Sequence, residues 1–540
     1  MKTSWMFGLV GIAFLAACVL PGCGMLGLRR SKDIACGPYL THAGQTTMSV
    51  RWTSDRYGDG AVAFHSAGEP VRRVPATVDC LRYPADPEDR DTALADLPPD
   101  GIAIAYLYEA RLEGLTPDTR YEYTVEFAGE TVESTFRTLT DDADAFTFVA
   151  FGDSQREDVV AGEIAPHQPA FLINTGDLVD RDYYPQYKEY FSPSVNAMTR
   201  RFPMAVSRGN HEQRGVVFAK LFGLDRDRMY YSFDYGNAHF VCLDSGLWRW
   251  PNPDENIARM LDWAERDLKQ SSARWKIVFF HEPLFDMSYR RGGSWGRDRL
   301  MPVLRRTGVD LVMAGHAHNY QRYAPLYTPG ENETHPITFV TSAGAGRAYL
   351  AMARVAVPHL AVRKATSHYM VYEIEGDTLR GRAIAVDGRE LDRFAIRKID
   401  SRLDRATVAR AVPEEPFGVL VDALSWLRMP MSGDKFEVGD TFEVPIELKA
   451  ASKALEYDIR PAPDCADVVE LVEPARGTVP AGGTAKVSVK LRAKVPIEKT
   501  GRRRQLEPRV YLHCHYKYGD LAGVMSTTRI RTYDPEKKKE

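Results

Sequence analysis

The residues best suited to chemistry are acids, imidazoles and carboxamides that directly follow apolar runs. The segment GHAHNYQR, residues 315–322, comes straight after VDLVMA. Four earlier apolar runs end in the same way, in FVAFGDSQ, INTGDLVD, SRGNHE and VFFHEPLF. The residues of metal-ligating type in these five segments are Asp153, Gln155, Asp177, Asn210, His211, Glu212, His281, His316 and His318.

These residue types indicate which ions the segments can bind. Carboxylates, imidazoles and carboxamides without a thiolate suit borderline ions such as manganese, iron and zinc. Side chains at the carboxyl ends of strands in an α/β sheet converge on one crevice, so distant segments can share one site. Two cations in one site need a bridging anion, and Asp177 is the best-placed residue for that role.

Each residue taken alone has a simpler explanation. Asp153 could cap a helix, Asn210 could hold a left-handed turn, and His281 could be a core histidine. Five such segments in order, each after an apolar run, favour a shared metal site over these separate explanations. The sequence therefore predicts a metal centre.

The elements that position these residues alternate between strand and helix patterns. From about residue 145 to about residue 398, short apolar strands alternate with helical patterns, which predicts an α/β layered domain. One of the helical patterns, at 256–270, has an apolar face. That face consists of Ile257, Met260, Leu261, Ala264 and Leu268.

All-β patterns flank this domain on both sides. Residues 34–140 contain alternating segments such as TMSVRWTS and RYEYTVEF between turn-rich stretches, as in a β-sandwich. After the linker SRLDRATVARAVPEEP, alternation returns in DTFEVPIELKA and TAKVSVKLRAKV. We therefore expect a second β-sandwich at about 415–536, which could support the catalytic domain or bind a protein or glycan partner.

The order of the motifs resembles the calcineurin-like metallophosphoesterase superfamily. GD, GDxxD, GNHE, a lone strand-end histidine and GHxH follow one another, and GHAHNYQR is similar to the purple acid phosphatase branch. Residues 34–140 resemble the fibronectin type III-like domain that precedes the catalytic domain in those enzymes. We therefore expect a multidomain α/β plus all-β fold, with an N-terminal β-sandwich, a central αββα sandwich and a C-terminal immunoglobulin-like β-sandwich.

The resemblance also implies how the ligands divide between two metal ions. The first ion would be held by Asp153, Gln155, Asp177 and His318, and the second by Asp177, Asn210, His281 and His316. His211 would lie near the phosphate, as a transition-state stabiliser or as the proton donor to the leaving oxygen.

Two positions depart from the family's pattern. Gln155 stands where the family at large has histidine, and Asp180 stands where purple acid phosphatases have tyrosine, three residues after Asp177. Without that phenolate we expect no tyrosinate-to-iron charge transfer. The neutral donors favour a divalent pair, with manganese, zinc and iron all open.

The expected activity is hydrolysis of phosphomonoesters by a hydroxide generated at two metal ions. A phosphodiesterase or nucleotide pyrophosphatase on the same site stays open, as does a surface-binding lipoprotein that has lost catalysis. Weaker candidates for substrate binding are Arg208, Arg290, Arg291 and Trp295, since arginine fits phosphate and tryptophan can stack on a ring. A solvated loop accounts for the last three equally well.

The first residues, MKTSWMFGLVGIAFLAACVLPGCG, have the pattern of an export signal. A basic Lys2 precedes an apolar run too short to span a membrane comfortably, and small residues follow. LAAC, ending at Cys18, resembles the lipobox of bacterial lipoproteins, and LPGC, ending at Cys23, is a second candidate. Residues 1–22 therefore predict a lipid-anchored protein of the bacterial cell envelope that faces the periplasm or the exterior. An ordinary signal peptide or a retained anchor is the alternative.

Composition narrows the remaining classes. The 540 residues carry 70 basic and 73 acidic side chains and are 44% apolar, which predicts several folded domains and argues against a nucleic-acid partner held by bulk positive charge. None of the seven cysteines has zinc-binding spacing. In an exported protein, Cys36 could pair with Cys80 and Cys465 with Cys514, although free buried thiols stay open.

Overall fold

The computed structural model describes residues 33–83, 102–247, 252–288, 296–346, 357–425, 427–500, 505–527, 530–533 and 535. The predicted signal segment with Cys18 and Cys23 lies outside these residues, as do Arg290, Arg291 and Trp295. Among the described residues, no helix combines the length and the apolar character needed to cross a membrane.

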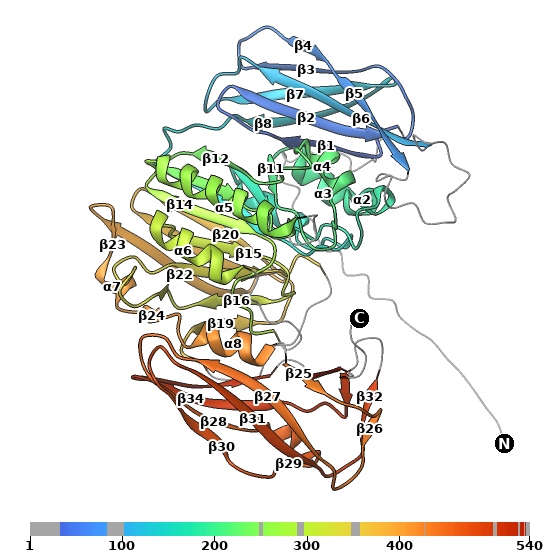
Figure 1. Ribbon diagram of the computed structural model, residues 1–540. Helices are drawn as coiled ribbons and strands as arrows, with labels where there is room; N and C mark the ends of the chain where they lie inside the picture. The colour runs from blue at the N-terminus through green and yellow to red at the C-terminus, as the bar shows by residue number, and fades with distance from the viewer. Residues whose placement is uncertain are drawn as a thin grey trace, which may run out of the picture.

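The N-terminal part is a sandwich of two four-stranded antiparallel sheets (Figure 1). One sheet has the order β1-β2-β6-β5, with bounds Cys36–Thr41, Thr47–Ser54, Ile102–Glu113 and Thr77–Tyr83. The other has the order β4-β3-β7-β8, with bounds Arg72–Pro75, Gly60–Ser66, Arg120–Phe127 and Glu130–Arg137. Inward residues of the strands meet between the sheets, where Trp52 stacks on Tyr108 at 5.2 Å between ring centroids. The alternating pattern of the sequence therefore builds the expected sandwich.

The central part contains two seven-stranded sheets packed face to face. The first has the order β11-β10-β9-β20-β21-β22-β23, with bounds Met204–Val206, Phe171–Asn174, Ala145–Phe151, His368–Glu375, Thr378–Ala385, Glu390–Ile399 and Arg402–Leu403. The second has the order β12-β13-β14-β15-β18-β16-β19, with bounds Tyr231–Tyr235, Ala238–Cys242, Trp275–Phe280, Leu311–Ala314, Thr338–Ser342, Tyr320–Tyr323 and Leu360–Lys364. Rings from both sheets, such as Phe148 and Phe240, meet in the core between them.

Helices cover the outer faces of both central sheets, which completes the αββα arrangement. On the first sheet lie α1 to α4, with bounds Ala161–Ile164, Tyr184–Tyr190, Pro193–Thr199 and Val216–Phe222, and a 3₁₀ turn at Ala165–His167. On the second lie α5, Pro253–Gln270, and α6, Arg297–Thr307. The predicted apolar face of α5 is buried, as its spacing requires.

The C-terminal part consists of small sheets around one core (Figure 1). One sheet has the order β25-β36-β33-β32-β26, with bounds Leu427–Pro430, Ile530–Tyr533, Gln505–Glu507, Ile497–Thr500 and Lys435–Phe436. The others are β27-β31-β29 (Thr441–Lys449, Thr484–Ala493, Val469–Leu471) and β30-β28-β34-β35 (Ala475–Val479, Leu455–Pro461, Leu512–Tyr518, Leu521–Ser526), with a 3₁₀ turn at Pro463–Cys465. The connection from the central part holds α7 (Arg405–Val408), β24 (Val412–Pro413) and α8 (Phe417–Ser425), and β24 pairs with β17 (Leu326–Tyr327) of the central part.

The described cysteines are all free thiols. Cys36, Cys242, Cys465 and Cys514 are buried, and Cys80 is half-buried. Neither of the two pairings that the sequence leaves open is formed. The thiols therefore serve as small apolar residues of the cores rather than as cross-links.

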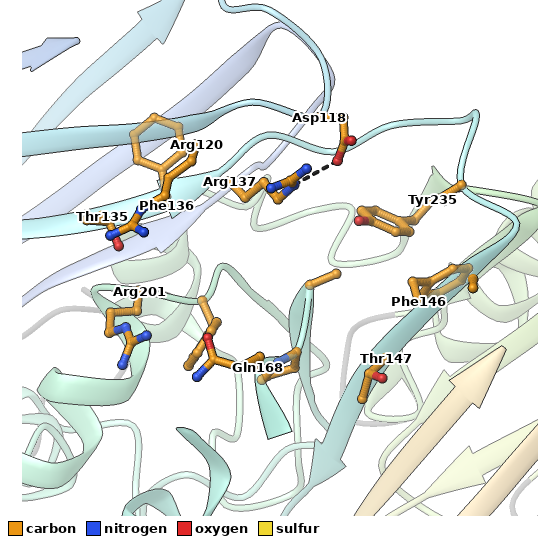
Figure 2. Close-up of a pocket in the computed structure, with 15 residues that line it drawn as sticks. Asp118, Arg120, Thr135, Phe136, Arg137, Phe146, Thr147, Gln168, Arg201 and Tyr235 are labelled. Atoms are coloured by element: carbon orange, nitrogen blue, oxygen red, sulfur yellow. Dashed lines mark hydrogen bonds and ion pairs between the residues drawn. The ribbon is translucent and has the colours of Figure 1, made fainter. Parts of the chain in front are cut away.

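A crevice of about 680 Å³ lies where the N-terminal sandwich meets the central sheets (Figure 2). Its lining includes Arg120, Phe146, Gln168 and an ion pair in which Arg137 donates to Asp118 over 2.7 Å. None of the acids or histidines that follow the central strands lines it. The residues of metal-ligating type therefore lie elsewhere, at the ends of the central strands.

Candidate metal centre

Five strands of the central sheets end at the candidate site. Asp153 follows β9 by two residues, Asp177 follows β10 by three, and Asn210 follows β11 by four. His281 directly follows β14, and His316 follows β15 by two residues. The first three strands are parallel to one another, as are β14 and β15. All five side chains thus start from the carboxyl ends of parallel strands, where such side chains converge.

The structure brings the acids and imidazoles into two overlapping groups. Asp177, His281 and His316 form one group, and Asp153, Asp177 and His318 form the other. Within each group, one possible donor atom per residue lies within 4.8 Å of the others. Asp177 belongs to both groups and is therefore placed to bridge two ions. The division of these residues is the one that the family resemblance implies.

The donor atoms are oriented as a metal would require. Asp177 Oδ2 lies 3.2 Å from His281 Nε2, and Asp153 Oδ1 lies 3.5 Å from His318 Nε2. Both carboxylate oxygens are buried and accept no hydrogen bond. Leaving a buried charged oxygen without a donor is costly, and a metal ion at each group would remove that cost. The residues present therefore fit a pair of metal ions.

Carbonyl groups fix the tautomer of the buried histidine. Nδ1 of His281 lies 2.8 Å from the carbonyl oxygen of Thr175, which can only accept a hydrogen bond. Nδ1 must therefore carry a proton, and Nε2, which faces the group with Asp177, is the nitrogen that can bind a metal. Nε2 also lies 3.2 Å from Oδ1 of Asn210 and 3.2 Å from Nδ1 of His316.

The electrostatics of the site couple acids to bases. Burial raises the pKa of Asp153 above its usual value, although His281 and His318 act against it. Burial acts in the same direction on Asp177, but His281 and the other imidazoles outweigh it and hold the pKa of Asp177 below its usual value. Burial lowers the pKa of His281, yet the carboxylate of Asp177 raises it overall to about 9. Metal binding would have to displace the proton that His281 holds in this environment.

The backbone at the site adopts unusual conformations. An extended GHxH segment would point both histidines the same way, but His316 and His318 have φ of 71° and 50° and lie between strands. Asp153 and Asp177 are also left-handed, with φ of 64° and 55°. Such conformations are sparsely populated outside glycine, although Asp and His tolerate them better than most residues. The two histidines therefore reach the site through a tight turn, in which His316 N donates to Asp153 Oδ2 over 2.8 Å.

The carboxylate of Asp177 is held by a close approach of the backbone at Gly209 and by a buried glutamate. A Cβ at Gly209 would lie 2.2 Å from Asp177 Oδ1, so only glycine fits there. Glu212 is fully buried and accepts from the backbone N–H groups of Asp177, Leu178 and Gly209 at 2.9, 2.7 and 2.8 Å. The glutamate of GNHE therefore ties this motif to the GDxxD motif, a role that the sequence alone did not assign.

His211 lies at the open side of the site. Its side chain is 29% exposed, whereas those of His281 and Asp177 are fully buried. Nδ1 lies 2.8 Å from the carbonyl oxygen of Asp180, so Nδ1 carries a proton and Nε2 faces the centre. Nε2 lies 3.8 Å from Asp177 Oδ2 and accepts from Nε2 of Gln155 over 3.3 Å. Gln155 is therefore within the site, in contact with His211.

Arg208 does not fit the expected role in substrate binding. Its side chain is fully buried, and its guanidinium donates to both carboxylate oxygens of Asp244 at 2.8–3.0 Å. The same guanidinium donates to the carbonyl oxygen of Gln213. Arg208 thus fixes the GNHE loop instead of facing substrate. Asp244, two residues after β13, is another acid at the end of a strand. The sequence pattern of an acid that follows an apolar run therefore also points to Asp244.

The tail of GHAHNYQR connects the histidine turn to the segment after His281. Asn319 Nδ2 donates to Ser288 Oγ over 3.2 Å, and Gln321 Nε2 donates to Asp286 Oδ1 over 2.7 Å. The backbone N–H of Met287 donates back to Gln321 Oε1 over 2.8 Å. Through these buried bonds, Asn319 and Gln321 hold the segment after His281 in place.

Comparison with known proteins agrees with this geometry. Residues 147–320 match the family model of the calcineurin-like phosphoesterases. Purple acid phosphatase 21 of Arabidopsis thaliana is 24% identical over 329 residues, which are 53% of this chain and 71% of that protein. Purple acid phosphatase 17 of the same plant is 25% identical over 207 residues, or 33% of this chain and 59% of its own length.

Solved structures show a shared fold. The purple acid phosphatase PPD1 from yellow lupin seeds aligns with a TM-score of 0.55 at 19% identity, over 69% of this chain and 75% of its own. A structure of PhoD aligns with a TM-score of 0.50 at 13% identity, over 71% and 93% of the two chains. Together with the two ligand groups, these matches identify the chain as a phosphoester hydrolase with a calcineurin-like phosphoesterase domain, related to the purple acid phosphatases.

Proposed function

We propose that the protein hydrolyses phosphomonoesters at a dinuclear metal centre. The observation that carries this proposal is the pair of ligand groups that share the buried carboxylate of Asp177. Two bound ions would polarise the phosphate ester and lower the pKa of a water molecule between them. Phosphoryl transfer needs positioning and charge neutralisation more than a covalent nucleophile, and the site offers both.

The chain's own residues divide the remaining tasks. The proposed holders of the first ion are Asp153, Gln155, Asp177 and His318, and those of the second are Asp177, Asn210, His281 and His316. His211 is the proposed proton donor to the leaving oxygen, because its Nε2 faces the centre and its side chain reaches solvent. The carbonyl of Asp180 keeps a proton on Nδ1, so Nε2 would donate its proton from the imidazolium form, in which both ring nitrogens are protonated.

The donor set favours a divalent pair, with manganese, zinc and iron as candidates. Asp180 occupies the position of the tyrosine ligand of purple acid phosphatases, and its carboxylate forms an ion pair with Arg156 at 2.7 Å. Position 180 therefore offers no phenolate to stabilise ferric iron, and neutral imidazoles and carboxamides suit divalent ions. We expect a colourless protein; an absorption band of a tyrosinate–iron complex would contradict this assignment.

The test combines elemental analysis with a substrate panel. Protein with each metal restored is assayed on an aryl phosphate, a bis-aryl phosphate and a nucleoside diphosphate, with Asp177→Asn as the matched site variant. We expect the monoester to be hydrolysed fastest and Asp177→Asn to lose metal and turnover together. If the bis-aryl phosphate is hydrolysed fastest, the protein is instead a phosphodiesterase. If the nucleoside diphosphate is hydrolysed fastest, it is a nucleotide pyrophosphatase. No turnover with metal bound would favour the binding lipoprotein; one relative is named "Probable inactive purple acid phosphatase 24".

We also propose that the protein is exported and anchored by lipid in a bacterial cell envelope. The support is the sequence LAAC at Cys18, after a short apolar run, with Cys23 as the second candidate. Cys18→Ser should release the protein from the membrane fraction. Retention of that variant, together with release of Cys23→Ser, would move the lipid to Cys23.

A further inference from the structure

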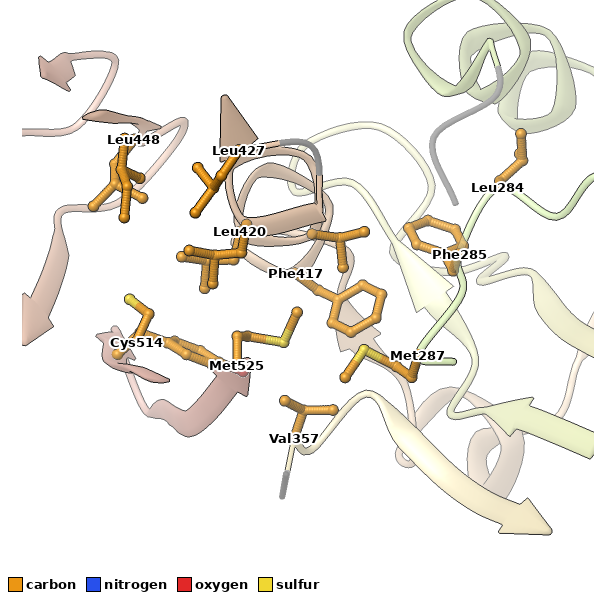
Figure 3. Packing of buried hydrophobic residues seen from close by; sticks show 14 of the residues in the cluster. Leu284, Phe285, Met287, Val357, Phe417, Leu420, Leu427, Leu448, Cys514 and Met525 are labelled. Atoms are coloured by element: carbon orange, nitrogen blue, oxygen red, sulfur yellow. The ribbon is translucent and has the colours of Figure 1, made fainter. Parts of the chain in front are cut away.

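The helix α8 joins the C-terminal sheets to the central sheets. Phe417, Leu420, Val421 and Leu424 of this helix are each at most 2% exposed. They belong to one apolar cluster that runs from the segment after His281 to the strands of the C-terminal sheets (Figure 3). Members of that cluster on the two sides of α8 include Phe285, Met287, Leu448 and Met525. Among the described residues, this cluster is continuous from the central sheets to the C-terminal sheets, so the two parts form one packed unit.

Phe417 packs against the segment that leaves the metal centre. Its ring centroid lies 5.6 Å from that of Phe285 and 5.6 Å from that of Tyr323. Phe285 is four residues beyond His281, and the hydroxyl of Tyr323 donates to Gln321 Oε1 over 2.7 Å. Gln321 in turn holds the backbone of Met287. Residues 282–288 are therefore fixed on one side by the GHAHNYQR tail and on the other by α8.

Arg297, the first residue of α6, cross-links this segment to α8. Its guanidinium donates to the carbonyl oxygen of Leu284 over 3.1 Å and to that of Gly418 over 2.6 Å. It also forms an ion pair with Asp422 and lies 5.3 Å from the ring centroid of Phe285. Arg297 is only 9% exposed, so its bonds to the two carbonyl oxygens form largely out of water, where they are stronger, whereas the side chain of Asp422 is 48% exposed. A Cβ at Gly418 would lie 2.9 Å from Nε of Arg297, so glycine is needed for this approach.

We propose that α8 and the C-terminal sheets are a positioning element of the active site. Phe417 and the Arg297 cross-link are the contacts by which they hold residues 282–288. These residues directly follow the proposed ligand His281. The inference rests on the proposed function for its kinetic effect. It assigns a task to the C-terminal part of the chain that the sequence leaves open.

The test compares Arg297→Met with variants that act on the same or a distant contact. Arg297→Met removes the cross-link, and Arg297→Lys keeps the charge and one donor. Gly418→Ala keeps every partner but displaces the guanidinium, and it serves if Arg297→Met does not fold. Val62→Ala is the control, because Val62 is buried in β3 of the N-terminal sandwich, in a cluster separate from the one that contains Phe285 and α8, so that its truncation destabilises the fold outside the proposed element.

We expect Arg297→Met to keep two metal ions per chain and to lower kcat/KM for the aryl phosphate by about 10-fold or more, since a misplacement of about 1 Å costs up to about 100-fold. Arg297→Lys should recover part of this loss, and Val62→Ala should leave kcat/KM unchanged. Amide hydrogen exchange in residues 282–288 should rise in Arg297→Met and Gly418→Ala, but not in Val62→Ala.

Two outcomes would overturn the proposal. One is unchanged exchange in residues 282–288 in both Arg297→Met and Gly418→Ala. The other is an equal loss of kcat/KM in Val62→Ala, which would indicate general destabilisation. If the wild-type protein hydrolyses none of the substrates, the proposed function fails, whereas the exchange comparison still decides whether α8 holds this segment.

Discussion

The contact between Gly209 and Asp177 yields the sharpest prediction. A Cβ added at Gly209 would lie 2.2 Å from Asp177 Oδ1, 2.3 Å from the backbone nitrogen of Asp177 and 2.7 Å from Oε2 of Glu212. Ordinary contact begins at 3.4 Å. In Gly209→Ala the bridging carboxylate must therefore move by about 1 Å, or the GNHE loop must move by as much in the other direction.

The expected cost follows from that displacement. A misplacement of about 1 Å in a catalytic group lowers the rate by about 100-fold, equivalent to about 2.7 kcal/mol of transition-state stabilisation. Asp177 belongs to both ligand groups, so the affinity for both ions should fall as well. We expect kcat/KM at saturating metal to fall by about 100-fold and the metal content of the purified protein to drop.

Gly162 provides the matched control for the assay. It lies inside α1, and a Cβ there would meet nothing within 4 Å. Gly162→Ala should leave kcat/KM and metal content unchanged and stabilise the fold by up to about 1 kcal/mol. The measurements are steady-state kinetics on an aryl phosphate and elemental analysis of both variants. Wild-type kcat/KM and metal content in Gly209→Ala would refute the reasoning that close packing at Gly209 positions the bridging ligand.

Three further predictions concern His211, Arg208 and His239. His211→Ala should lower kcat by about 100-fold or more while metal content stays near wild type, as expected for a general acid that is not a ligand; elemental analysis showing loss of metal would make His211 structural instead. Arg208→Met should lower the free energy of unfolding by about 3–5 kcal/mol, because it leaves the buried carboxylate of Asp244 without its ion-pair partner. Arg393→Met, which removes an exposed ion pair, should lower it by at most about 1 kcal/mol. Equal shifts of the urea midpoint in the two variants would contradict this prediction. His239 is 5% exposed and contacts Asp234 and Asp267 at 2.8 and 2.9 Å; burial lowers its pKa, but the two carboxylates raise it above the usual value overall. The contribution of His239 to stability is therefore complete below about pH 6.5 and is lost as the pH rises through the raised pKa. His239→Gln should consequently destabilise the protein more at pH 6 than at pH 9. Thermal unfolding in which the variant loses the same stability at both pH values would contradict this prediction.

The ligand types and the order of their motifs could be predicted because the relevant physics is local. An apolar run of strand length followed by an acid or histidine, with or without a glycine between them, places that side chain at a strand end, whatever the rest of the chain does. Asp153, Asp177, His281, His316 and His318 were found in this way, and their convergence follows from the general geometry of α/β sheets. The buried face of α5 was likewise read from a periodicity within one helix.

Other features depend on contacts between residues far apart in the chain. Arg208 has the right chemistry for phosphate, and only the position of Asp244, 36 residues away, shows that its guanidinium is already bound in the core. The left-handed turn at His316 and His318 depends on the carboxylate of Asp153, 163 residues earlier. Neither partner is visible in the local pattern, because pairing over such separations is decided by how the sheets pack.

The sequence by itself therefore determined the donor set, the strands that deliver it and the β-rich character of the parts on either side, since these rest on residue type and on periodicity within one element. The tertiary structure decided which donors lie together in each group, which arginine is structural, that the described cysteines are free thiols, and that α8 fuses the C-terminal sheets to the segment after His281. Burial and distance are properties of the packed molecule, and they emerge only when elements distant in the chain meet.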